Sequence, residues 1–395
     1  MSVVSQALLE ETIAIRRDLH AHPELSFAEV RTAALVAERL RAFGLEVRES
    51  IGKTGVVGVL SGARPGPTIM LRADMDALPM LEESEVSYRS KNAGVAHACG
   101  HDAHVAMLLG AAQILKERAP EVHGRIAFVF QPGEEVGGGA EGMLRDGLMQ
   151  RFGITRAYGL HVLTALAGTG TKALPSNAFG VRPGSLMAGS DSFDLVIDGR
   201  GGHGAAPHLS VDPIAIAAEV VTALQRIVSR ETDPVEPAVL SIGAIAGGTT
   251  YNVIPPRVSL EGDIRSFNET TRAHMQQRIF EIAQHVCAAA GAQCSIDWLP
   301  PCPATVNDPV EAAFVKETLT ERFGSSRVVE SPLVTGSEDF SYFLNVVPGC
   351  FYFLGAFDER RPFPNHHPAF DIDESAMSAG IEAHVAIALA AGARS

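Results

Sequence analysis

Several features that mark other classes of protein are scarce or missing in this sequence. Aromatic residues make up only 6% of it and no run of lysine and arginine occurs, which argues against nucleic-acid binding. No stretch of 18 consecutive apolar residues is present, so we expect no transmembrane helix. The first 25 residues lack the basic start, apolar stretch and cleavage site of a secretory leader. We therefore expect a cytoplasmic protein.

Cysteine and positive charge are also scarce. The five cysteines form an odd number without CxxC spacing, which argues against a disulfide framework. Lys+Arg 32 against Asp+Glu 46 gives a formal net charge of −14, which disfavours binding to nucleic acid and to anionic membranes. What remains is an ordinary globular composition, with 46% hydrophobic and 20% charged residues in 395 positions. That length exceeds what one hydrophobic core usually supports, so we expect two domains.

Strands and helices alternate through most of the chain. Short, nearly continuous apolar runs predict buried strands, and segments with helical periodicity lie between them. This order is typical of an α/β domain with a mainly parallel central sheet flanked by helices. The predicted strands are 55–60, 68–74, 125–132, 156–162 and 350–357, and the predicted helices include 27–43, 102–118, 140–148 and 374–392.

A different pattern occupies the middle of the chain. After a loop at 175–190 that contains Pro and Gly, the segment SFDLVIDG alternates with period two, and the order that follows is β-α-β-β-α-β. That order matches a ferredoxin-like α+β domain. We therefore expect a discontinuous domain formed by 1–185 and 302–395, interrupted by an inserted domain at 186–301. The elements predicted in the insertion include a helix at 212–229, strands at 236–246 and 252–267, a helix at 269–290 and a strand at 293–299.

Cys99 and His101 stand two residues apart in the segment HACGHDAH, separated by Gly100. A loop can turn both side chains inward, and thiolate and imidazole bind borderline metals such as zinc, with cobalt, nickel and manganese as alternatives. The other interpretation is a buried cysteine among ordinary polar histidines, since free cysteines are commonly buried. On these residues alone both interpretations stay open. His104 is expected to start a helix rather than to bind metal.

Three further polar segments occupy strand ends and loops, where α/β sheets place their ligands. Glu134 and Glu135 follow a predicted buried strand, where adjacent carboxylates are costly unless a cation compensates them. In an extended segment the two point in opposite directions, so that one can bind metal while the other reaches a water. His161 ends another strand, and His366 and His367 lie in a polar loop. The alternative for Glu134 and Glu135 is a solvated acidic pair. The alternative for His161 is a core histidine, and that for His366 and His367 is a pair of surface histidines.

The motifs resemble a known family over essentially the whole chain, the aminoacylase and hippurate hydrolase branch of the dinuclear metallo-amidohydrolases and carboxypeptidases. The matching segments, in order, are RRDLHAHPELSFAE, RADMDALP, HACGHDAHVAMLLGAA, QPGEEVGGGA, GRGGHGAAPH, TTYNVIP, GSEDFS and HHPAFDIDE. The wider clan has a metal-binding histidine in an HxD motif, whereas this chain has Arg72-Ala73-Asp74. That departure is typical of the amidohydrolase branch and argues against the ligand set of the peptidase branch. Asp74 is instead expected to orient the metal ligands through hydrogen bonds.

The resemblance implies two divalent metal ions per chain, manganese or zinc, with cobalt or nickel as alternatives. The implied ligands are Cys99, His101, Glu135, His161 and His366. Cys99 would take the bridging position that an aspartate holds in related peptidases. His366 is preferred over His367 because the family pattern reads His-x-Pro. Glu134 would be the general acid and base.

The inserted domain resembles the family's lid, which also forms the contact of a homodimer or homotetramer. In this domain His203 would contact the substrate carbonyl, in its own active site or in that of the partner subunit. Asn252 and Arg265 are candidates for binding the carboxylate of the substrate. Asn252 has the alternative of a turn residue before Pro255, and Arg265 that of a partner in a surface salt bridge.

The resemblance further implies hydrolysis of the amide bond of an N-acyl-L-amino acid, hippurate-like or N-acetylated, to a carboxylic acid and an amino acid. One alternative is a metallo-carboxypeptidase or dipeptidase that acts on short peptides. Another is a ligand-binding protein of the same fold without catalytic activity, against which the presence of every ligand candidate and of Glu134 counts. No nucleic-acid or membrane partner is expected.

Overall fold

The structure of the chain is a computed structural model that describes residues 3–164 and 174–394. The chain divides into two compact units. The first comprises Met1–Leu186, Val306–Val334 and Asp339–Ser395, and the second comprises Met187–Thr305 and Thr335–Glu338. The second unit includes residues 302–305, which the expected boundaries place in the first domain, because Ser190 and Cys302 exchange backbone hydrogen bonds of 2.8 and 2.9 Å.

The first unit is built on a mixed sheet. Its strands are β1 (Glu46–Ile51), β2 (Gly55–Ser61), β3 (Arg64–Asp74), β4 (His123–Gln131), β5 (Ile154–Leu163), β6 (Phe179–Val181), β15 (Val328–Glu330) and β16 (Gly349–Gly355). Their order is β1-β2-β4-β3-β5-β16-β6-β15. The pairs β4-β3, β3-β5, β5-β16 and β6-β15 are parallel, whereas β1-β2, β2-β4 and β16-β6 are antiparallel. The predicted α/β class with a mainly parallel sheet is confirmed.

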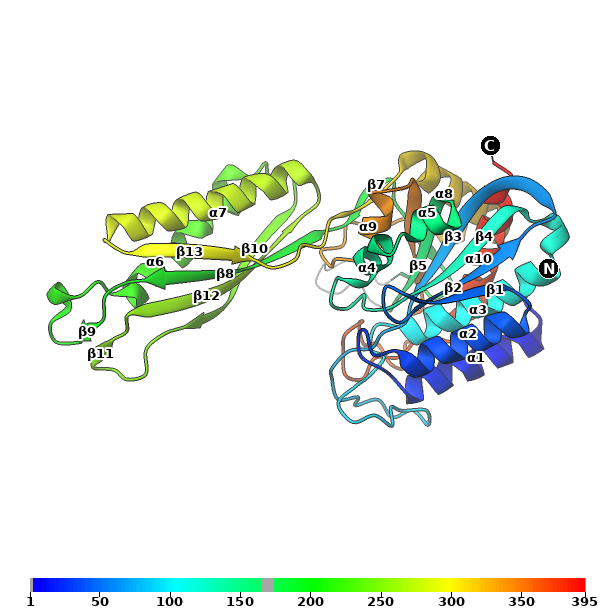
Figure 1. Ribbon diagram of the computed structural model, residues 1–395, viewed down its shortest axis with the longest axis horizontal. Coiled ribbons are helices and arrows are strands. Elements are labelled where there is room, and N and C mark those ends of the chain that lie inside the picture. Colours follow the sequence, from blue (N-terminus) through cyan, green and yellow to red (C-terminus); the bar gives the residue numbers. More distant parts are fainter. Residues whose placement is uncertain (1–2, 165–173, 395) are drawn as a thin grey trace. The chain divides into compact units, whose positions relative to one another are not determined.

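Helices cover both faces of this sheet. They are α1 (Gln6–Ala21), α2 (Val30–Ala42), α3 (His101–Glu117), α4 (Gly139–Arg145), α5 (Leu148–Phe152), α8 (Pro309–Phe323), α9 (Ser341–Leu344) and α10 (Ala376–Gly392). One face is covered by α2, α3, α8 and α10, with α1 resting on α3, while α4, α5 and α9 lie on the other (Figure 1). Among the described residues no helix has the length and apolarity needed to cross a bilayer.

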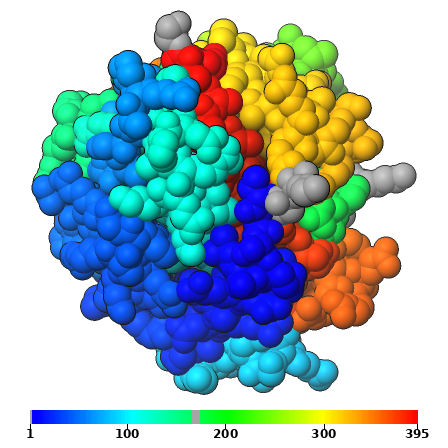
Figure 2. All heavy atoms as spheres, turned by 90° about the vertical axis from the view of Figure 1, so that its right-hand side faces the viewer, coloured from blue at the N-terminus to red at the C-terminus, as the bar shows by residue number. Residues whose placement is uncertain are grey.

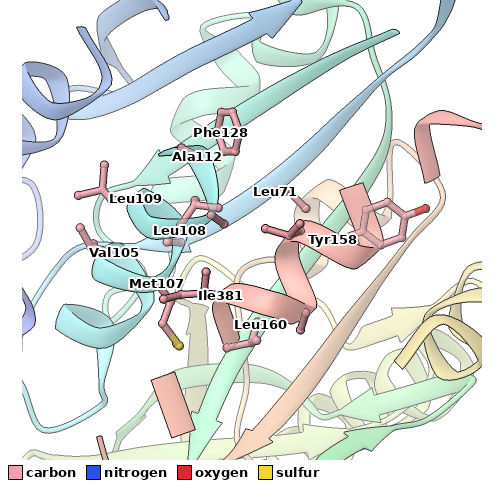
Figure 3. Packing of buried hydrophobic residues seen from close by; sticks show 14 of the residues in the cluster. Leu71, Val105, Met107, Leu108, Leu109, Ala112, Phe128, Tyr158, Leu160 and Ile381 are labelled. Carbon is pink, nitrogen blue, oxygen red and sulfur yellow. The ribbon is translucent and has the colours of Figure 1, made fainter. Parts of the chain in front are cut away.

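Helix α3 lies at the centre of the core of the first unit. Its side chains are buried along almost the whole helix, and several of them belong to the same buried cluster as Phe128 of β4 (Figure 3). The helix also approaches α10 closely, since a Cβ at Gly380 would lie 2.2 Å from Met107 Sδ. Packing on several sides therefore holds α3, which begins at His101, in place.

The beginning and the end of the chain build this core together. Helix α1 packs against α10 as well as against α3. On the face of the first unit drawn in Figure 2, the N-terminal segment in blue lies beside the C-terminal segment in red. The residues that follow the second unit in sequence thus complete the core that the residues before it begin.

The second unit has its own sheet and core. Its strands are β8 (Gly189–Asp198), β10 (Ala238–Ala246), β12 (Arg257–Ser266) and β13 (Gln293–Trp298), and its helices are α6 (Pro213–Leu224) and α7 (Glu269–Ala289). The order β10-β12-β8-β13 is antiparallel throughout, with α6 and α7 packed together on one face (Figure 1). Two short strands, β9 (Gly202–His203) and β11 (Val253–Ile254), pair separately. The predicted inserted α+β fold is confirmed.

Some predicted elements are interrupted. The helix expected at 140–148 splits into α4 and α5 because Gly147, with a φ of 80°, separates them. The strand expected at 252–267 splits at Pro255-Pro256, which lack the N–H groups that a ladder needs. The helix expected at 212–229 ends at Leu224 and is followed by a π-helical turn at Ile227–Glu231. The short strands β7 (Gly184–Met187) and β14 (Thr305–Asn307) contain points where the chain passes from one unit to the other.

Candidate active site

The predicted metal-binding residues gather at the carboxyl ends of the central strands. Strand β3 ends at Asp74, β4 leads into the turn that carries Glu134 and Glu135, and His161 lies near the end of β5. Because β3, β4 and β5 are parallel neighbours, these ends meet at one edge of the sheet, where α/β folds place their ligands. The first turn of α3 and the loop that carries His366 complete the group.

Gly100 directs Cys99 and His101 toward this edge. It precedes α3 with a φ of 93°, a left-handed conformation that glycine adopts at little cost. A Cβ at this position would lie 2.3 Å from Val162 Cγ2, so that space as well as conformation requires glycine. The Cys-Gly-His spacing of the sequence therefore has a backbone reason.

The side-chain atoms of the candidates face one another. Cys99 Sγ is 3.4 Å from His161 Nε2, and His101 Nε2 is 3.8 Å from Glu135 Oε1. His366 Nε2 is 3.5 Å from Glu135 Oε2. Two atoms bound to one ion at about 2.0–2.3 Å with tetrahedral geometry lie about 3.3–3.8 Å apart. The structure thus brings the predicted ligands together, within the first unit, at separations that suit a metal ion.

The hydrogen bonds of His101 and His161 use Nδ1 and leave Nε2 for a cation. His101 Nδ1 donates to the carbonyl of Asp76 at 2.9 Å, and His161 Nδ1 donates to the carbonyl of Val162 at 2.7 Å, so that the lone pair of each neutral imidazole lies on Nε2. His101 Nε2 and Glu135 Oε1 are buried without a hydrogen-bond partner. Such atoms are rare in native proteins, and a cation between them satisfies both. The residues therefore fit a divalent metal centre.

The protonation of four of the five ligand candidates is consistent with the same interpretation. Burial raises the pKa of Glu135 to about 7, and burial together with the Glu135 carboxylate raises the pKa of the Cys99 thiol well above its usual value. Burial also lowers the pKa of His161 and of His366, which keeps both imidazoles neutral. A divalent cation would restore the carboxylate and the thiolate and would bind the neutral imidazoles.

Glu134 and Glu135 approach the same imidazole. Glu134 Oε2 lies 4.0 Å from His101 Nε2, close to the 3.8 Å of Glu135 Oε1. The expectation that the two carboxylates point in opposite directions is wrong, because β4 has ended and the segment is a turn. Gly133 begins that turn with a φ of 64°, and its N–H donates to Glu29 Oε1 at 2.9 Å.

Asp76 belongs to the site, although the motifs did not single it out. Its carbonyl accepts the His101 hydrogen bond, and its Oδ2 accepts from the Glu135 N–H at 3.0 Å and from the Ser26 hydroxyl at 2.7 Å. Burial opposes its ionisation, but the His101 imidazole, whose Nδ1 lies 3.3 Å from Asp76 Oδ1, holds the pKa of Asp76 below its usual value. Asp76 thus connects two ligand candidates from different elements. The signal in the sequence is the second acidic residue of RADMD.

His366 faces the cluster and His367 does not. His366 has a φ of 68°, an uncommon conformation for a residue other than glycine and one that is found at functional sites. The neighbouring Asn365 Nδ2 donates to the Cys99 carbonyl at 3.0 Å and so ties this loop to the Cys-Gly-His turn. His367 stacks on Phe363, with ring centroids 4.3 Å apart.

His203 and Asn252 lie next to each other in the second unit. His203 is exposed on β9, which pairs with β11 directly after Asn252. The N–H of Gly204 donates to the Asn252 carbonyl at 2.8 Å, and His203 Nδ1 accepts from the Ala205 N–H at 3.0 Å. The structure therefore places these two candidates in one two-stranded ribbon, in which the local turn engages Nδ1 of His203.

Arg265 lies on a separate strand of the same unit, β12. Its Nε donates to Asp263 Oδ2 at 2.7 Å and its Nη1 donates to Ser337 Oγ at 3.0 Å. Its side chain is 28% exposed, so part of the guanidinium can still reach a ligand. Both the structural and the substrate-binding interpretations of Arg265 are compatible with this environment.

Comparison with known proteins agrees with the geometry. Residues 70–390 match Peptidase family M20/M25/M40. The chain is 42% identical over 383 residues to Thermostable carboxypeptidase 2 of Saccharolobus solfataricus, which covers 95% of this chain and 94% of that protein. It is 40% identical over 370 residues to N-acetyl-L-cysteine deacetylase of Bacillus subtilis, with coverage of 94% and 85%.

A solved structure gives the same assignment. The crystal structure of a Bacillus subtilis protein, described as a dinuclear metal binding peptidase from the M20 family, is similar with a TM-score of 0.83. It shares 34% sequence identity and covers 98% of this chain and 99% of that chain. The resemblance that the motifs indicated is confirmed, and the chain belongs to peptidase family M20/M25/M40.

Proposed function

We propose that this chain hydrolyses the amide bond of N-acyl-L-amino acids at a centre of two divalent metal ions. The observation that carries the proposal is the buried pair of His101 Nε2 and Glu135 Oε1, 3.8 Å apart and each without a hydrogen-bond partner. The proposed ligands are Cys99, His101, Glu135, His161 and His366. Five candidates exceed the four ligands of one tetrahedral ion, so together they would hold two ions. Manganese or zinc is the proposed metal, with cobalt or nickel as alternatives, because such ligands accept several ions.

The chemistry divides between the metals and the chain. When bound, the metal ions supply a water of lowered pKa and a Lewis acid for the substrate's carbonyl oxygen. Glu134 accepts the proton of the attacking water and then delivers it to the leaving amine. Its carboxylate, 4.0 Å from His101 Nε2 and 10% exposed, is close enough to the ligands for one water to lie between. His203 is proposed to donate to the substrate carbonyl, in its own subunit or in the partner's site.

Recognition of the substrate's carboxylate depends on local cations. The formal net charge of −14 gives no attraction for an anionic substrate at long range. Besides the metals, Arg265 is the proposed cation, and Asn252 is a proposed hydrogen-bonding partner. The half-buried position of Arg265 and its contact with Ser337 hold its guanidinium in place.

Replacing Arg265 by alanine should raise the KM for an N-acyl amino acid and change kcat less. A charge-assisted hydrogen bond contributes about 1.5–3 kcal/mol, which corresponds to roughly a 10- to 150-fold increase in KM. Arg257→Ala is the matched control, because Arg257 lies on the same strand and pairs with Asp198 at the surface. Steady-state kinetics with an N-acyl amino acid measure both variants. An unchanged KM in a folded Arg265→Ala protein would rule out this assignment.

A comparison of substrates tests the proposed activity. The metal-loaded protein should hydrolyse benzoyl-glycine or an N-acetyl amino acid with a higher kcat/KM than Ala-Gly or Gly-Gly. The second candidate is a carboxypeptidase, favoured by the 42% identity to a protein of that name. Faster release of the C-terminal residue from short peptides than from acylated amino acids would replace the first proposal by the second.

We further propose a homodimer or homotetramer that forms through the second unit. Large apolar side chains are exposed there, among them Tyr251 at 99%, Val235 at 82% and Ile245 at 56%. Exposed apolar side chains of this size suit a symmetric contact between copies. Light scattering that finds only monomer at micromolar concentration would contradict this proposal.

A further inference from the structure

His104 is a buried histidine beside the proposed ligands whose two ring nitrogens are already engaged. It lies within the first turn of α3, because that helix begins at His101 rather than at His104 as expected. Its Nδ1 is 2.6 Å from Asp74 Oδ1, and its Nε2 accepts the N–H of Val162 at 2.9 Å. A backbone N–H can only donate, so Nε2 carries no proton and Nδ1 donates to Asp74. Neither nitrogen is available to a metal.

The hydrogen bond to Val162 acts on the residue next to a proposed ligand. The pairing of β5 with β3 ends at Arg72–Gly159, so the last residues of β5 have no strand on that side. His104 supplies the acceptor that the Val162 N–H would otherwise need. The Val162 carbonyl in turn accepts from His161 Nδ1 at 2.7 Å and so sets the orientation of that imidazole.

The other side of His104 is anchored by a permanent charge. Arg72 Nη1 donates to Asp74 Oδ2 at 2.5 Å, and both side chains are fully buried. Arg72 Nε also donates to Gln131 Oε1 at 2.8 Å, at the end of β4. Arg72, Asp74 and His104 therefore form a connected series from the centre of the sheet to the end of β5.

We propose that His104 is a positioning residue for the metal centre. It holds the end of β5 so that His161 presents Nε2 toward Cys99, while Asp74 and Arg72 fix the tautomer of His104 itself. This inference rests on the proposed metal ligands. It also assigns a purpose to Arg72 and Asp74, whose side chains are fully buried. Arg72 acts through Asp74.

Two substitutions of His104 separate its two hydrogen bonds. In His104→Gln, the Oε1 atom can still accept from the Val162 N–H, whereas the donor to Asp74 is lost. In His104→Asn, the shorter side chain can still donate to Asp74, whereas the Val162 N–H loses its acceptor. The two variants have the same polar group at the same buried position and differ in its reach.

Metal binding is the readout, measured by competition with a chromogenic chelator on the full-length chain. Loss of an outer hydrogen bond typically weakens metal binding about 10- to 100-fold. We expect that loss for His104→Asn and a loss below about tenfold for His104→Gln. With cobalt(II), the visible absorption bands should shift in His104→Asn and stay as in the wild type in His104→Gln, because they report the geometry of the ligands.

Each outcome decides the proposal. Wild-type affinity and cobalt spectrum in folded His104→Asn would overturn the positioning role and leave the metal centre intact. Equal large losses in both variants would also overturn it, because they indicate that His104 binds metal or serves the fold alone. If His104→Asn does not fold, the test depends on His104→Gln alone. A decrease in metal affinity of more than about tenfold in folded His104→Gln would then overturn the positioning role. A wild-type protein that binds no metal would overturn the inference together with the proposed function.

Discussion

Glu134→Gln should lower kcat for an N-acyl amino acid by about 10²- to 10⁴-fold while the metal content stays that of the wild type. Glutamine keeps the size and the hydrogen-bonding capacity of the side chain but cannot take a proton from water. Glu134 lies next to the proposed ligands, with its Oε2 4.0 Å from His101 Nε2, but is not proposed as one of them. Its replacement therefore leaves all five proposed ligands in place. The measurement pairs steady-state kinetics with metal analysis of the same sample.

Glu141→Gln is the control for this substitution. Glu141 lies on α4, a few residues further along the chain, and pairs with Arg145 at the surface. Its replacement should leave both kcat and metal content unchanged. Turnover close to the wild type in metal-loaded Glu134→Gln would eliminate Glu134 as the general base. Loss of the metal together with activity would instead make Glu134 a ligand.

Arg16→Met should lower the free energy of unfolding by about 3–5 kcal/mol, the usual cost of leaving buried charges without their partner. Arg16 has no exposed side-chain surface. Its Nε donates to Asp102 at 2.8 Å and its Nη2 donates to Asp371 at 2.6 Å, and neither carboxylate is exposed. Methionine fills a similar volume without the charge. Asp102 follows His101 directly, so this network also supports the first turn of α3.

A surface arginine gives the matched control. Arg31 pairs with Asp18 at 2.7 Å, with both side chains about two-fifths exposed at 41% and 40%. Arg31→Met should change the free energy of unfolding by less than about 1 kcal/mol. Urea unfolding of the three proteins measures the difference. Equal stabilities of Arg16→Met and Arg31→Met would show that the buried network does not stabilise the fold.

The pH dependence of the same variant follows from the carboxylates. Burial opposes their ionisation, but Arg16 holds the pKa of Asp102 and of Asp371 below the usual range. This contribution to stability is fully present above the unfolded value of about 3.9 and is lost as the pH falls toward the folded values. The deficit of Arg16→Met should therefore be largest near neutral pH and should shrink below about pH 4.

The sequence predicts those parts of the fold that are either strongly apolar or strongly periodic. The apolar runs of β2, β3, β4, β5 and β16 stand out because these strands are buried on both faces. Strand β1, with the sequence EVRESI, was missed because most of it is exposed and its residues are polar. Strands β6 and β15 are three residues each, too short for a periodic pattern to register.

The site divides in a similar way. Cys99, His101 and Glu135 could be proposed as ligands from the sequence because ligand-type residues cluster within short motifs at strand ends. The roles of Asp76 and His104 could not, because they depend on contacts between β3, α3 and the end of β5. Such contacts are set by the register of neighbouring strands and by tautomers, neither of which a single sequence specifies.

Stepwise addition of metal to chelator-treated protein tests whether hydrolysis depends on two bound metal ions. We expect no hydrolysis of benzoyl-glycine by the metal-free protein, and recovery of activity as manganese or zinc is added up to two equivalents per chain. The metal-loaded protein should also unfold at a higher temperature, because ions that bind the folded state stabilise it. Full hydrolysis by protein that holds far less than one equivalent of metal would contradict hydrolysis at a dinuclear metal centre.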